Sequence, residues 1–525
     1  MRNKLTYLLC FAGMLAGTQS LAQDNISAPL SVIDWLDTQP QSPPATPAVS
    51  KPPAPKPVVR IEEPEVADSV TVPEVTVQPL GQNAAKRVGL APASVTGLPD
   101  ALWSSDSGQV LVRKFKALPE LRLPALQSLY YTLLLAETLP PATDSDAFDL
   151  ARVDALFDLG ALDPAKALLE QAGPDTSPAH FARFMDMSLL ARSEANACAI
   201  LQARPKLSPG KAHEVFCAAR AGDWDTAVLQ LGTGRVLGLI DALTTQALER
   251  FLDPDLFEEE PPLPSPRMRN PLMFRLFEAI GTPIPTRSWP VVYANADLSD
   301  TAGWKAQIEA SERLARTGAV PDNRLLGLYT QRRPAASGSV WDRVAALQRF
   351  ETALGTGSAS AVSKTLPTAW SAMGDARLRV HFANLFAEDL SAMTLSGTTA
   401  DIAFEVLLLS PDYETAATTF PVRALRRPAL AAIAAGNVPD SVQADGTADA
   451  ILSAFRDAPA DDSIVTQAQS GHLGVALLDT LALTVEGAQG DIARLTTGLA
   501  TLRALGLEDV ARRTALQTLL LESSR

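Results

Sequence analysis

Apolar residues recur at helical spacing along most of this chain, from about residue 119 to the C-terminus. The clearest stripe lies at i, i+3, i+4, i+7 and i+8 within residues 126–134. Its members are Leu126, Leu129, Tyr130, Leu133 and Leu134. Similar stripes run through residues 340–354 and 492–502, and short breaks rich in Gly, Pro, Asp and Ser separate the segments. Because short helices joined by short loops pack antiparallel, the pattern predicts a helical-repeat body over residues 119–525.

The composition agrees with a helical body. Hydrophobic residues make up 46% of the chain and aromatic residues only 6%, and Ala and Leu supply most of the apolar side chains. Both are strong helix formers, whereas strand-rich domains need Val, Ile and aromatic residues. We therefore expect an all-α fold, arranged as an irregular α-solenoid of helical hairpins. Before the body, residues 81–118 predict an irregular lead-in with a short strand at Gln109–Val112.

A short motif, Gly-x-x-Asp-x-Ala, recurs at three expected helix-to-helix turns. The copies are Gly160–Ala165, Gly222–Ala227 and Gly506–Ala511. In each, Gly ends one helix in a left-handed conformation and Asp caps the next helix or lies in its first turn. Ala then permits close approach of the paired helices. The motif therefore predicts three tight hairpin turns.

The second copy, together with the residues before it, resembles the turn and second helix of a tetratricopeptide repeat. The resemblance covers Cys217–Ala227 and the single turns at the other two copies. The intervals between copies are too irregular for an array with a repeat of about 34 residues. What the resemblance implies is an α-solenoid of degenerate hairpins, and a general helical bundle is the alternative.

The first 22 residues have the three-part layout of a secretory signal peptide. Arg2 and Lys4 precede an apolar run at residues 5–17, and Ser20 and Ala22 supply small residues for cleavage near Ala22. The run is shorter than the roughly 20 apolar residues of a membrane span, and no later segment reaches that length. We therefore expect export to the periplasm and no membrane span.

The mature N-terminus combines a short apolar motif with a proline-rich tract. Residues 23–37 include Ile33, Trp35 and Leu36, and residues 38–80 form a Pro-rich segment that cannot build a core. We expect a disordered linker that presents the apolar motif for docking to a partner. The alternative is that these side chains fold back onto the helical body.

Two cysteines remain after the signal peptide, Cys198 and Cys217. Each lies in a segment that predicts a helix, residues 193–202 and 211–220. Ser208 suits the N-cap of the second helix and Pro209 its first position. Antiparallel packing would bring the thiols together, and an oxidising compartment favours a disulfide. Two buried free thiols are the alternative.

Charge and motifs exclude several function classes. The net charge of −14 disfavours binding to nucleic acid and to anionic lipid. The four histidines are not clustered, and no nucleotide-binding or nucleophile motif is present. These histidines are His180, His213, His381 and His472. We therefore expect no catalytic residue, no metal site and no cofactor.

Two loops and one basic cluster are the remaining candidates for function. Residues 253–271 predict an exposed loop, and residues 281–303 form a loop in which Trp289 and Tyr293 are candidates for binding a ligand. The alternative is that these aromatic side chains only pin the loop to the body. A basic cluster would bind an anionic ligand or would simply be solvated. Its members are Lys305, Arg324, Arg332 and Arg333.

The layout as a whole resembles a set of uncharacterised exported Ala/Leu-rich helical proteins of Gram-negative bacteria, sometimes labelled antifreeze glycopeptide-like. The shared features are residues 27–36, the proline tract and Asn323–Tyr329. The chain lacks an Ala-Ala-Thr array, which sets ice binding aside, and the resemblance implies no activity. We expect a non-catalytic periplasmic interaction or scaffold protein whose partner is an unidentified periplasmic or envelope protein. A cell-envelope enzyme or a glycan- or peptide-binding protein is the alternative.

Overall fold

The computed structural model describes residues 86–334 and 336–522. The fold described below is that of the unit Leu80–Arg525, which is called the second unit because it follows Met1–Pro79 in the chain. The signal peptide, the proline-rich tract and the docking residues Ile33, Trp35 and Leu36 lie outside the described residues, so the predictions made for them stay predictions.

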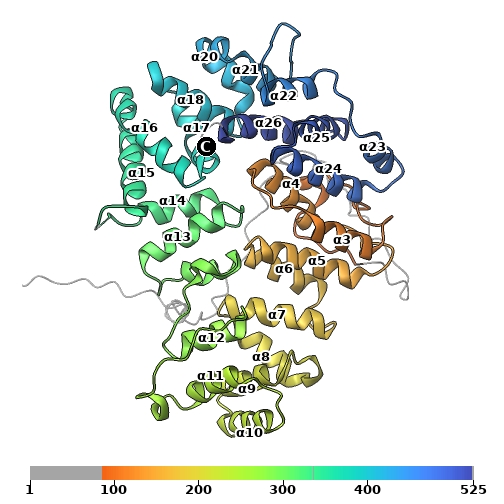
Figure 1. Cartoon of the computed structure of the whole chain (residues 1–525), viewed down its shortest axis with the longest axis vertical. Coiled ribbons are helices and arrows are strands. Elements are labelled where there is room, and N and C mark those ends of the chain that lie inside the picture. The colour runs from red at the N-terminus through yellow and green to blue at the C-terminus, as the bar shows by residue number, and fades with distance from the viewer. Residues whose placement is uncertain (1–85, 335, 523–525) are drawn as a thin grey trace, which may run out of the picture. The chain divides into compact units, whose positions relative to one another are not determined.

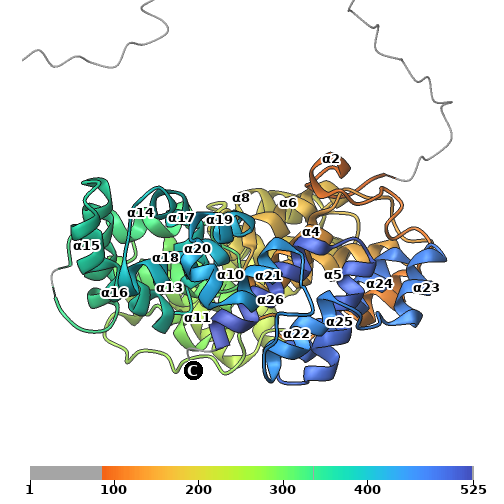
Figure 2. The same ribbon diagram turned by 90° about the horizontal axis from the view of Figure 1, so that it is seen from above.

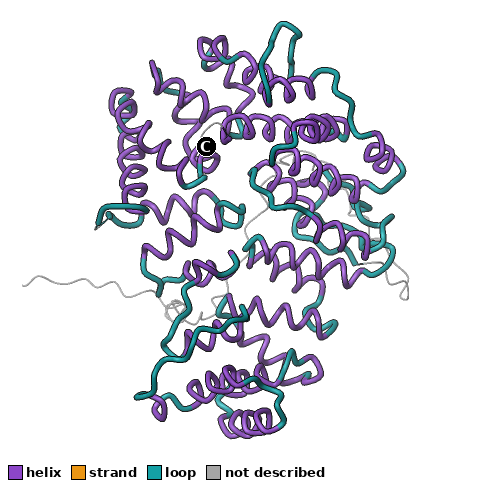
Figure 3. The backbone as a smooth tube through the Cα atoms, in the orientation of Figure 1, coloured by secondary structure: helices purple, strands orange, loops and turns teal. Residues whose placement is uncertain are grey.

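The second unit is all-α, as the sequence predicts. Within the described residues no β-strand is present, and extended segments meet only in isolated bridges such as that between Val88 and Thr138. Figure 3 shows helices joined mostly by short connections, with longer loops between some of them, such as that between residues 252 and 271. The helices of the first half are α2 Ala93–Thr96, α3 Gly108–Ala117, α4 Pro124–Leu135, α5 Ser145–Asp158, α6 Leu162–Ala172, α7 Pro178–Leu190, α8 Glu194–Ala203, η1 Pro205–Leu207, α9 Lys211–Arg220, α10 Trp224–Val236, α11 Ala242–Leu252, η2 Asp255–Phe257 and α12 Pro271–Ala279.

The second half continues in the same manner, with two further 3₁₀ helices ahead of its first α-helix. Its elements are η3 Thr286–Ser288, η4 Val291–Leu298, α13 Trp304–Ala315, α14 Asp322–Thr330, α15 Val340–Gly355, α16 Ala359–Asp375, α17 Arg379–Ser391, α18 Gly397–Leu409, η5 Tyr413–Thr415, α19 Ala416–Thr419, α20 Pro421–Arg426, α21 Pro428–Ala435, α22 Thr447–Phe455, α23 Asp462–Gln469, α24 Leu473–Ala488, α25 Ile492–Ala504 and α26 Glu508–Glu522. The expected loop at residues 253–271 is largely exposed, as predicted, whereas residues 281–303 contain two 3₁₀ helices.

The strand expected at Gln109–Val112 is wrong, because these residues lie inside α3. The Ser107 hydroxyl caps this helix by accepting a hydrogen bond from the backbone N–H of Val110, with an N···O distance of 3.4 Å. Leu111 and Phe115, one turn apart, are buried. This helical spacing and the cap outweigh the local strand preference of the two valines.

The three Gly-x-x-Asp-x-Ala turns form as predicted. Gly160, Gly222 and Gly506 have φ angles of 81°, 80° and 82°, and each lies between two helices. The residue after each glycine donates its N–H to a carbonyl five residues earlier, which is the Schellman closure of a helix end. The alanine five residues after each glycine is completely buried. These alanines are Ala165, Ala227 and Ala511.

The same turn also occurs where arginine replaces glycine. Arg192 and Arg377 have φ angles of 54° and 58°. The following N–H groups donate to the carbonyls of Ser188 and Met373 at 2.9 and 2.8 Å. An L-residue in this region costs about 1 kcal/mol or more, and the surrounding hairpin maintains the conformation. The hairpin turn is therefore more frequent than its glycine motif indicates.

Most helices pack against their neighbours in sequence, and the ends of the second unit also meet. The pairs α9–α10, α15–α16, α17–α18 and α24–α25 are typical hairpins. In addition, α26 packs on α4 and α24 packs on α3, as Figures 1 and 2 show. The Gln517 Oε1 atom accepts a hydrogen bond of 2.9 Å from the Ala125 N–H, and Lys114 forms an ion pair with Asp479. Each end of the helical array thus covers the apolar face of the other.

A fully buried arginine joins the lead-in to this array. Arg152 of α5 is 1% exposed, and its guanidinium donates to the carbonyls of Leu134, Ala136 and Val88 at distances between 2.6 and 3.0 Å. Burial lowers the pKa of Arg152 to about 10, and the nearby Asp149 carboxylate opposes that shift. The guanidinium satisfies carbonyls at the C-terminal end of α4 that the helix leaves unpaired.

Candidate functional site

A cavity of about 1040 Å³ lies where the first, middle and last parts of the second unit converge. Its walls come from the segment between α3 and α4, from α5, from the end of α13, from the α16–α17 turn and from the end of α24. Ionisable side chains line much of it. They are Lys116, Glu120, Arg122, Asp154, Asp158, Arg313, Arg316, Asp375, Arg377, Arg379 and His381. The arginine and lysine side chains outnumber the carboxylates, although the chain as a whole is acidic.

Four arginines form one wall of the cavity, which we call the arginine wall: Arg313, Arg316, Arg377 and Arg379. The guanidinium groups of three of them are held in place by contacts with other parts of the protein. Arg313 donates to the Thr286 and Trp289 carbonyls at 3.0 and 2.8 Å, and Arg316 donates to the Ala376 carbonyl at 2.7 Å. The Arg379 guanidinium lies over the Trp370 ring, 4.9 Å from its centroid. A rigid set of cations thus faces the cavity.

Arg377 differs from its neighbours because its side chain is exposed. It occupies the left-handed turn between α16 and α17, and its guanidinium forms no hydrogen bond or ion pair with the residues that the structure describes. Burial lowers the pKa of Arg316, the Glu312 carboxylate opposes that shift, and the nearby guanidinium groups of Arg343 and Arg377 add to it. This mutual repulsion is the electrostatic condition that a bound anion would relieve.

A buried cluster behind the wall positions Arg316. Glu312 is 3% exposed and accepts hydrogen bonds from the Tyr329 hydroxyl at 2.6 Å and from the Arg343 guanidinium at 2.8 Å. Arg316 donates to the same carboxylate at 3.3 Å. Tyr329 is fully buried and ends the Asn323–Tyr329 segment that carries the family resemblance. The role that the structure gives this tyrosine is the support of the arginine wall.

Two carboxylates of α5 line another part of the cavity. Asp154 and Asp158 are one helical turn apart, and Asp154 accepts a hydrogen bond of 2.5 Å from Arg183. Partial desolvation raises the pKa of the Asp158 carboxyl, and the charge of Asp154 raises it further. The cavity therefore contains both cationic groups and a carboxyl that protonates more readily than usual.

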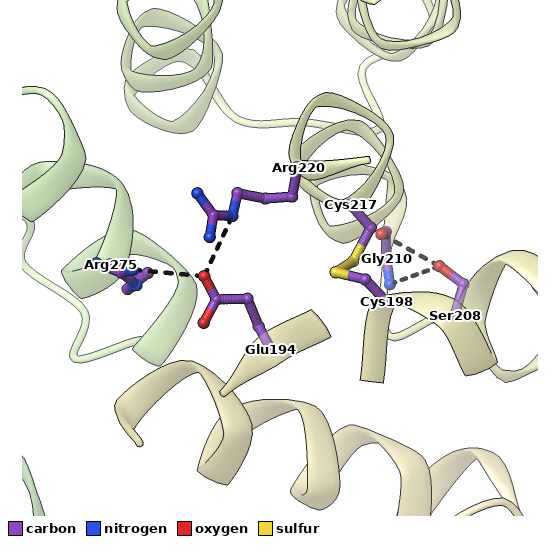
Figure 4. The surroundings of a disulfide bond; sticks show 7 residues. All are labelled: Glu194, Cys198, Ser208, Gly210, Cys217, Arg220 and Arg275. Atoms are coloured by element: carbon purple, nitrogen blue, oxygen red, sulfur yellow. Dashed lines mark hydrogen bonds and ion pairs between the residues drawn. A yellow bond between two sulfur atoms is a disulfide. The ribbon is translucent and has the colours of Figure 1, made fainter. Parts of the chain in front are cut away.

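The predicted disulfide between Cys198 and Cys217 is confirmed. It joins α8 to α9 with a Cα–Cα distance of 5.1 Å (Figure 4). The helix start predicted at Ser208 and Pro209 is wrong, because α9 begins at Lys211. The Ser208 hydroxyl instead accepts a hydrogen bond of 3.3 Å from the Gly210 N–H, in a turn that precedes the helix.

An ion cluster lies beside the disulfide and links α8 to α9 and α12. Glu194 is 2% exposed, and Arg220 and Arg275 approach its carboxylate within 3.3 and 3.4 Å (Figure 4). Arg275 also pairs with Glu278 at 2.6 Å, and Glu278 pairs with Arg192. The cluster holds the hairpin of α8 and α9 against α12, and it lies outside the cavity.

The candidate ligand residues Trp289 and Tyr293 pack against one another and against Phe274 of α12. Their ring centroids lie 4.7 Å apart in an edge-to-face arrangement, and Phe274 lies 5.2 Å from Tyr293. Tyr293 is 3% exposed and Trp289 is half-buried. This packing fixes the segment to the body, and its backbone carbonyls hold Arg313. A ligand-binding role for the two rings stays a prediction.

The cavity arginines were not identified from the sequence. The expected basic cluster at Lys305, Arg324, Arg332 and Arg333 does not line the cavity. Within residues 86–334 and 336–522, no group of three or more His, Cys, Asp or Glu side chains is placed to hold a metal ion. No helix of these residues is long and apolar enough to cross a membrane. Comparison with family models, curated proteins and solved structures gives no significant match.

Proposed function

We propose that this is a non-catalytic interaction or scaffold protein of the periplasm, whose cavity receives a segment of its partner. The observation that carries the proposal is the arginine wall, which presents fixed guanidinium groups in a cavity of about 1040 Å³. That volume is at the upper end of small-molecule pockets and suits a short peptide segment. We read the hairpins as degenerate tetratricopeptide-like units, an architecture that offers extended binding surfaces.

The partner segment that fits this site is acidic. Guanidinium groups bind carboxylates with directional hydrogen bonds, and a cavity with walls of low dielectric strengthens such pairs. Arg377 is exposed and unpaired among the described residues, so it is the first group that an incoming carboxylate would meet. The proposed compartment is supported by the signal-peptide layout and by the disulfide, which fits an oxidising environment.

Site-specific photo-crosslinking in periplasm tests the proposal. A crosslinking amino acid at Gln489, which lines the cavity, should capture one defined partner, and the same amino acid at the exposed Lys364 of α16 should not. Arg377→Glu should reduce the capture at least tenfold, whereas the control Lys364→Glu should leave it unchanged. Equal capture from both positions, or capture that does not respond to Arg377→Glu, would contradict the proposal.

A cell-envelope enzyme is the second candidate, and the α5 carboxylates favour it. A carboxyl with a raised pKa beside a second acidic side chain is a common arrangement in acid–base catalysis. Asp158 and Asp154 meet that description within the cavity. If the purified protein released soluble products from peptidoglycan, and Asp158→Asn abolished the release without changing the circular dichroism spectrum, the enzyme would replace the scaffold. Turnover that survives this substitution would place catalysis elsewhere.

A further inference from the structure

Helix α10 exposes apolar side chains on its outer surface, which we call the α10 apolar face. Ala227 and Leu231 point inward and are buried, and α10 packs mainly against α9 and α11. The outer residues include the turn that follows the helix. They are Trp224, Val228, Leu229, Val236, Leu237 and Leu239, with exposed fractions of 50, 59, 71, 80, 64 and 60%. Contiguous exposure of this kind marks an interaction surface.

The position of α10 leaves this face accessible within the second unit. The chain leaves α7, forms α8 to α11, and returns to pack α12 on α7. In Figure 1, α10 is the outermost helix of this excursion, at the lower end of the view. A helix that only completed the core would carry mainly polar residues on its outer side, whereas α10 exposes large apolar residues beside Asp225, Thr233 and Arg235.

The α10 apolar face is symmetric about one glycine. Val228 lies four residues before Gly232 and Val236 four residues after it, so all three share one stripe of the helix. A Cβ added at Gly232 would meet nothing within 4 Å. An antiparallel copy of the same helix would therefore bring Val228 of each chain against Val236 of the other, and the glycines would allow the backbones to approach closely.

We propose that this face is the contact of a homodimer, in which two copies pair α10 antiparallel across a two-fold axis through Gly232. A two-fold contact requires a surface that is complementary to itself, and the arrangement about Gly232 provides it. Trp224 of one copy then reaches the exposed turn at residues 237–239 of the other. The contact is independent of the cavity, to which no residue of α10 contributes.

The exposed area and the charge of the α10 apolar face both favour a second copy of this chain as its binding partner. Each of the six side chains is at least half exposed, and together they make a surface on the order of the roughly 800 Å² per partner of a stable specific interface. The only charged residues of α10 are Asp225 and Arg235, which are opposite in sign, and Arg235 pairs with Glu249 at 3.1 Å. Asp225 and Arg235 are exposed on the same side of α10 as the apolar residues, and their charges cancel. Since the chain carries a net charge of −14, copies repel one another over most of their surface, and a face with no net charge is where they can meet.

Analytical ultracentrifugation of the mature chain over about 1–100 µM tests the proposal. The wild type should sediment as a dimer, and Val228→Glu should weaken dimerisation at least a hundredfold. The matched control Val422→Glu, at an exposed valine of α20, should remain dimeric. Because both valines are exposed, circular dichroism should show the same fold for all three proteins. A wild type that is monomeric throughout, or a Val228→Glu variant that dimerises normally, would overturn the proposal.

A cysteine on the proposed axis tests the geometry. Gly232→Cys should form a disulfide-linked dimer under mild oxidation, and Val422→Cys should not. Crosslinking by both variants at equal rates would contradict the two-fold arrangement. If instead deletion of residues 27–37 created a dimer from a monomeric wild type, the occupant would be the chain's own N-terminal motif and the homodimer would be rejected.

Discussion

Removal of the Cys198–Cys217 disulfide should destabilise the part of the second unit that contains α8 and α9. The two cysteines are 19 residues apart in sequence and both are buried. In the chain-entropy model, closing a loop of this length stabilises the folded state by about 3 kcal/mol, because it restricts the unfolded chain. The double variant Cys198→Ala/Cys217→Ala should therefore lose about that much stability.

The size of the thermal shift depends on how much of the chain unfolds together. If the whole second unit unfolds as one, a loss of about 3 kcal/mol spread over more than 400 residues lowers Tm by only about 3 °C. If α8 to α11 unfold separately, the same loss acts on about 60 residues and lowers the Tm of that segment by roughly 20 °C. The helical-repeat architecture favours the second outcome, since each hairpin contacts mainly its neighbours.

Hydrogen exchange with mass spectrometry separates these outcomes. The amides of α9 should exchange about a hundredfold faster in the double variant, which corresponds to about 3 kcal/mol of lost opening free energy. The amides of α24, far along the array, serve as the internal control and should keep their protection. Unchanged protection in α9, or an equal loss in α24, would refute the reasoning that the disulfide stabilises its own hairpin.

Three further substitutions test the energetics of single side chains. Arg152→Met should cost about 3–5 kcal/mol in urea unfolding because it leaves buried carbonyls unpaired, and a loss below 1 kcal/mol would contradict that role. Arg377→Gly should raise stability by about 0.5–1 kcal/mol in thermal unfolding, since glycine adopts the positive φ without strain; a lower Tm would argue against strain at this turn. Burial lowers the pKa of His213 to about 4, below its unfolded value of about 6.5, so the unfolded chain binds the proton first and stability falls by about 3 kcal/mol as pH drops from 6.5 to 4. His213→Asn should remove this part of the pH dependence of urea unfolding. If the variant kept the same dependence of stability on pH, groups other than His213 would be responsible for it.

The local turns were predictable from the sequence wherever glycine marks them. Gly160, Gly222 and Gly506 adopt the expected conformation because a residue without a Cβ enters the left-handed region freely. Arg192 and Arg377 adopt it under the constraint of the hairpins around them, and no local signal distinguishes them from ordinary helical arginines. The number of hairpin turns was therefore underestimated, although their type was correct.

The cavity was not predictable in the same way. Its lining residues extend from Phe115 to Leu521, so it exists only because the two ends of the array pack together. That closure depends on single contacts such as the Gln517 side chain with the Ala125 backbone, which carry no periodic signal. Arginines that are close in sequence suggested a basic cluster near residue 330, whereas the arginine wall combines α13 with the α16–α17 turn.

The distribution of charge connects the two proposals. A chain with a net charge of −14 repels its own copies and acidic partners alike. Both kinds of contact therefore need a region of the protein whose local charge is neutral or positive. The arginine wall makes the lining of the cavity locally positive. An acidic segment bound there would be attracted most strongly, because the surrounding walls exclude water. The α10 apolar face carries only two charged residues, Asp225 and Arg235, which are opposite in sign, so a second copy meets little net repulsion there. Because the two features share no residue, Arg377→Glu should impair partner capture without changing the sedimentation of the dimer, and Val228→Glu should do the reverse.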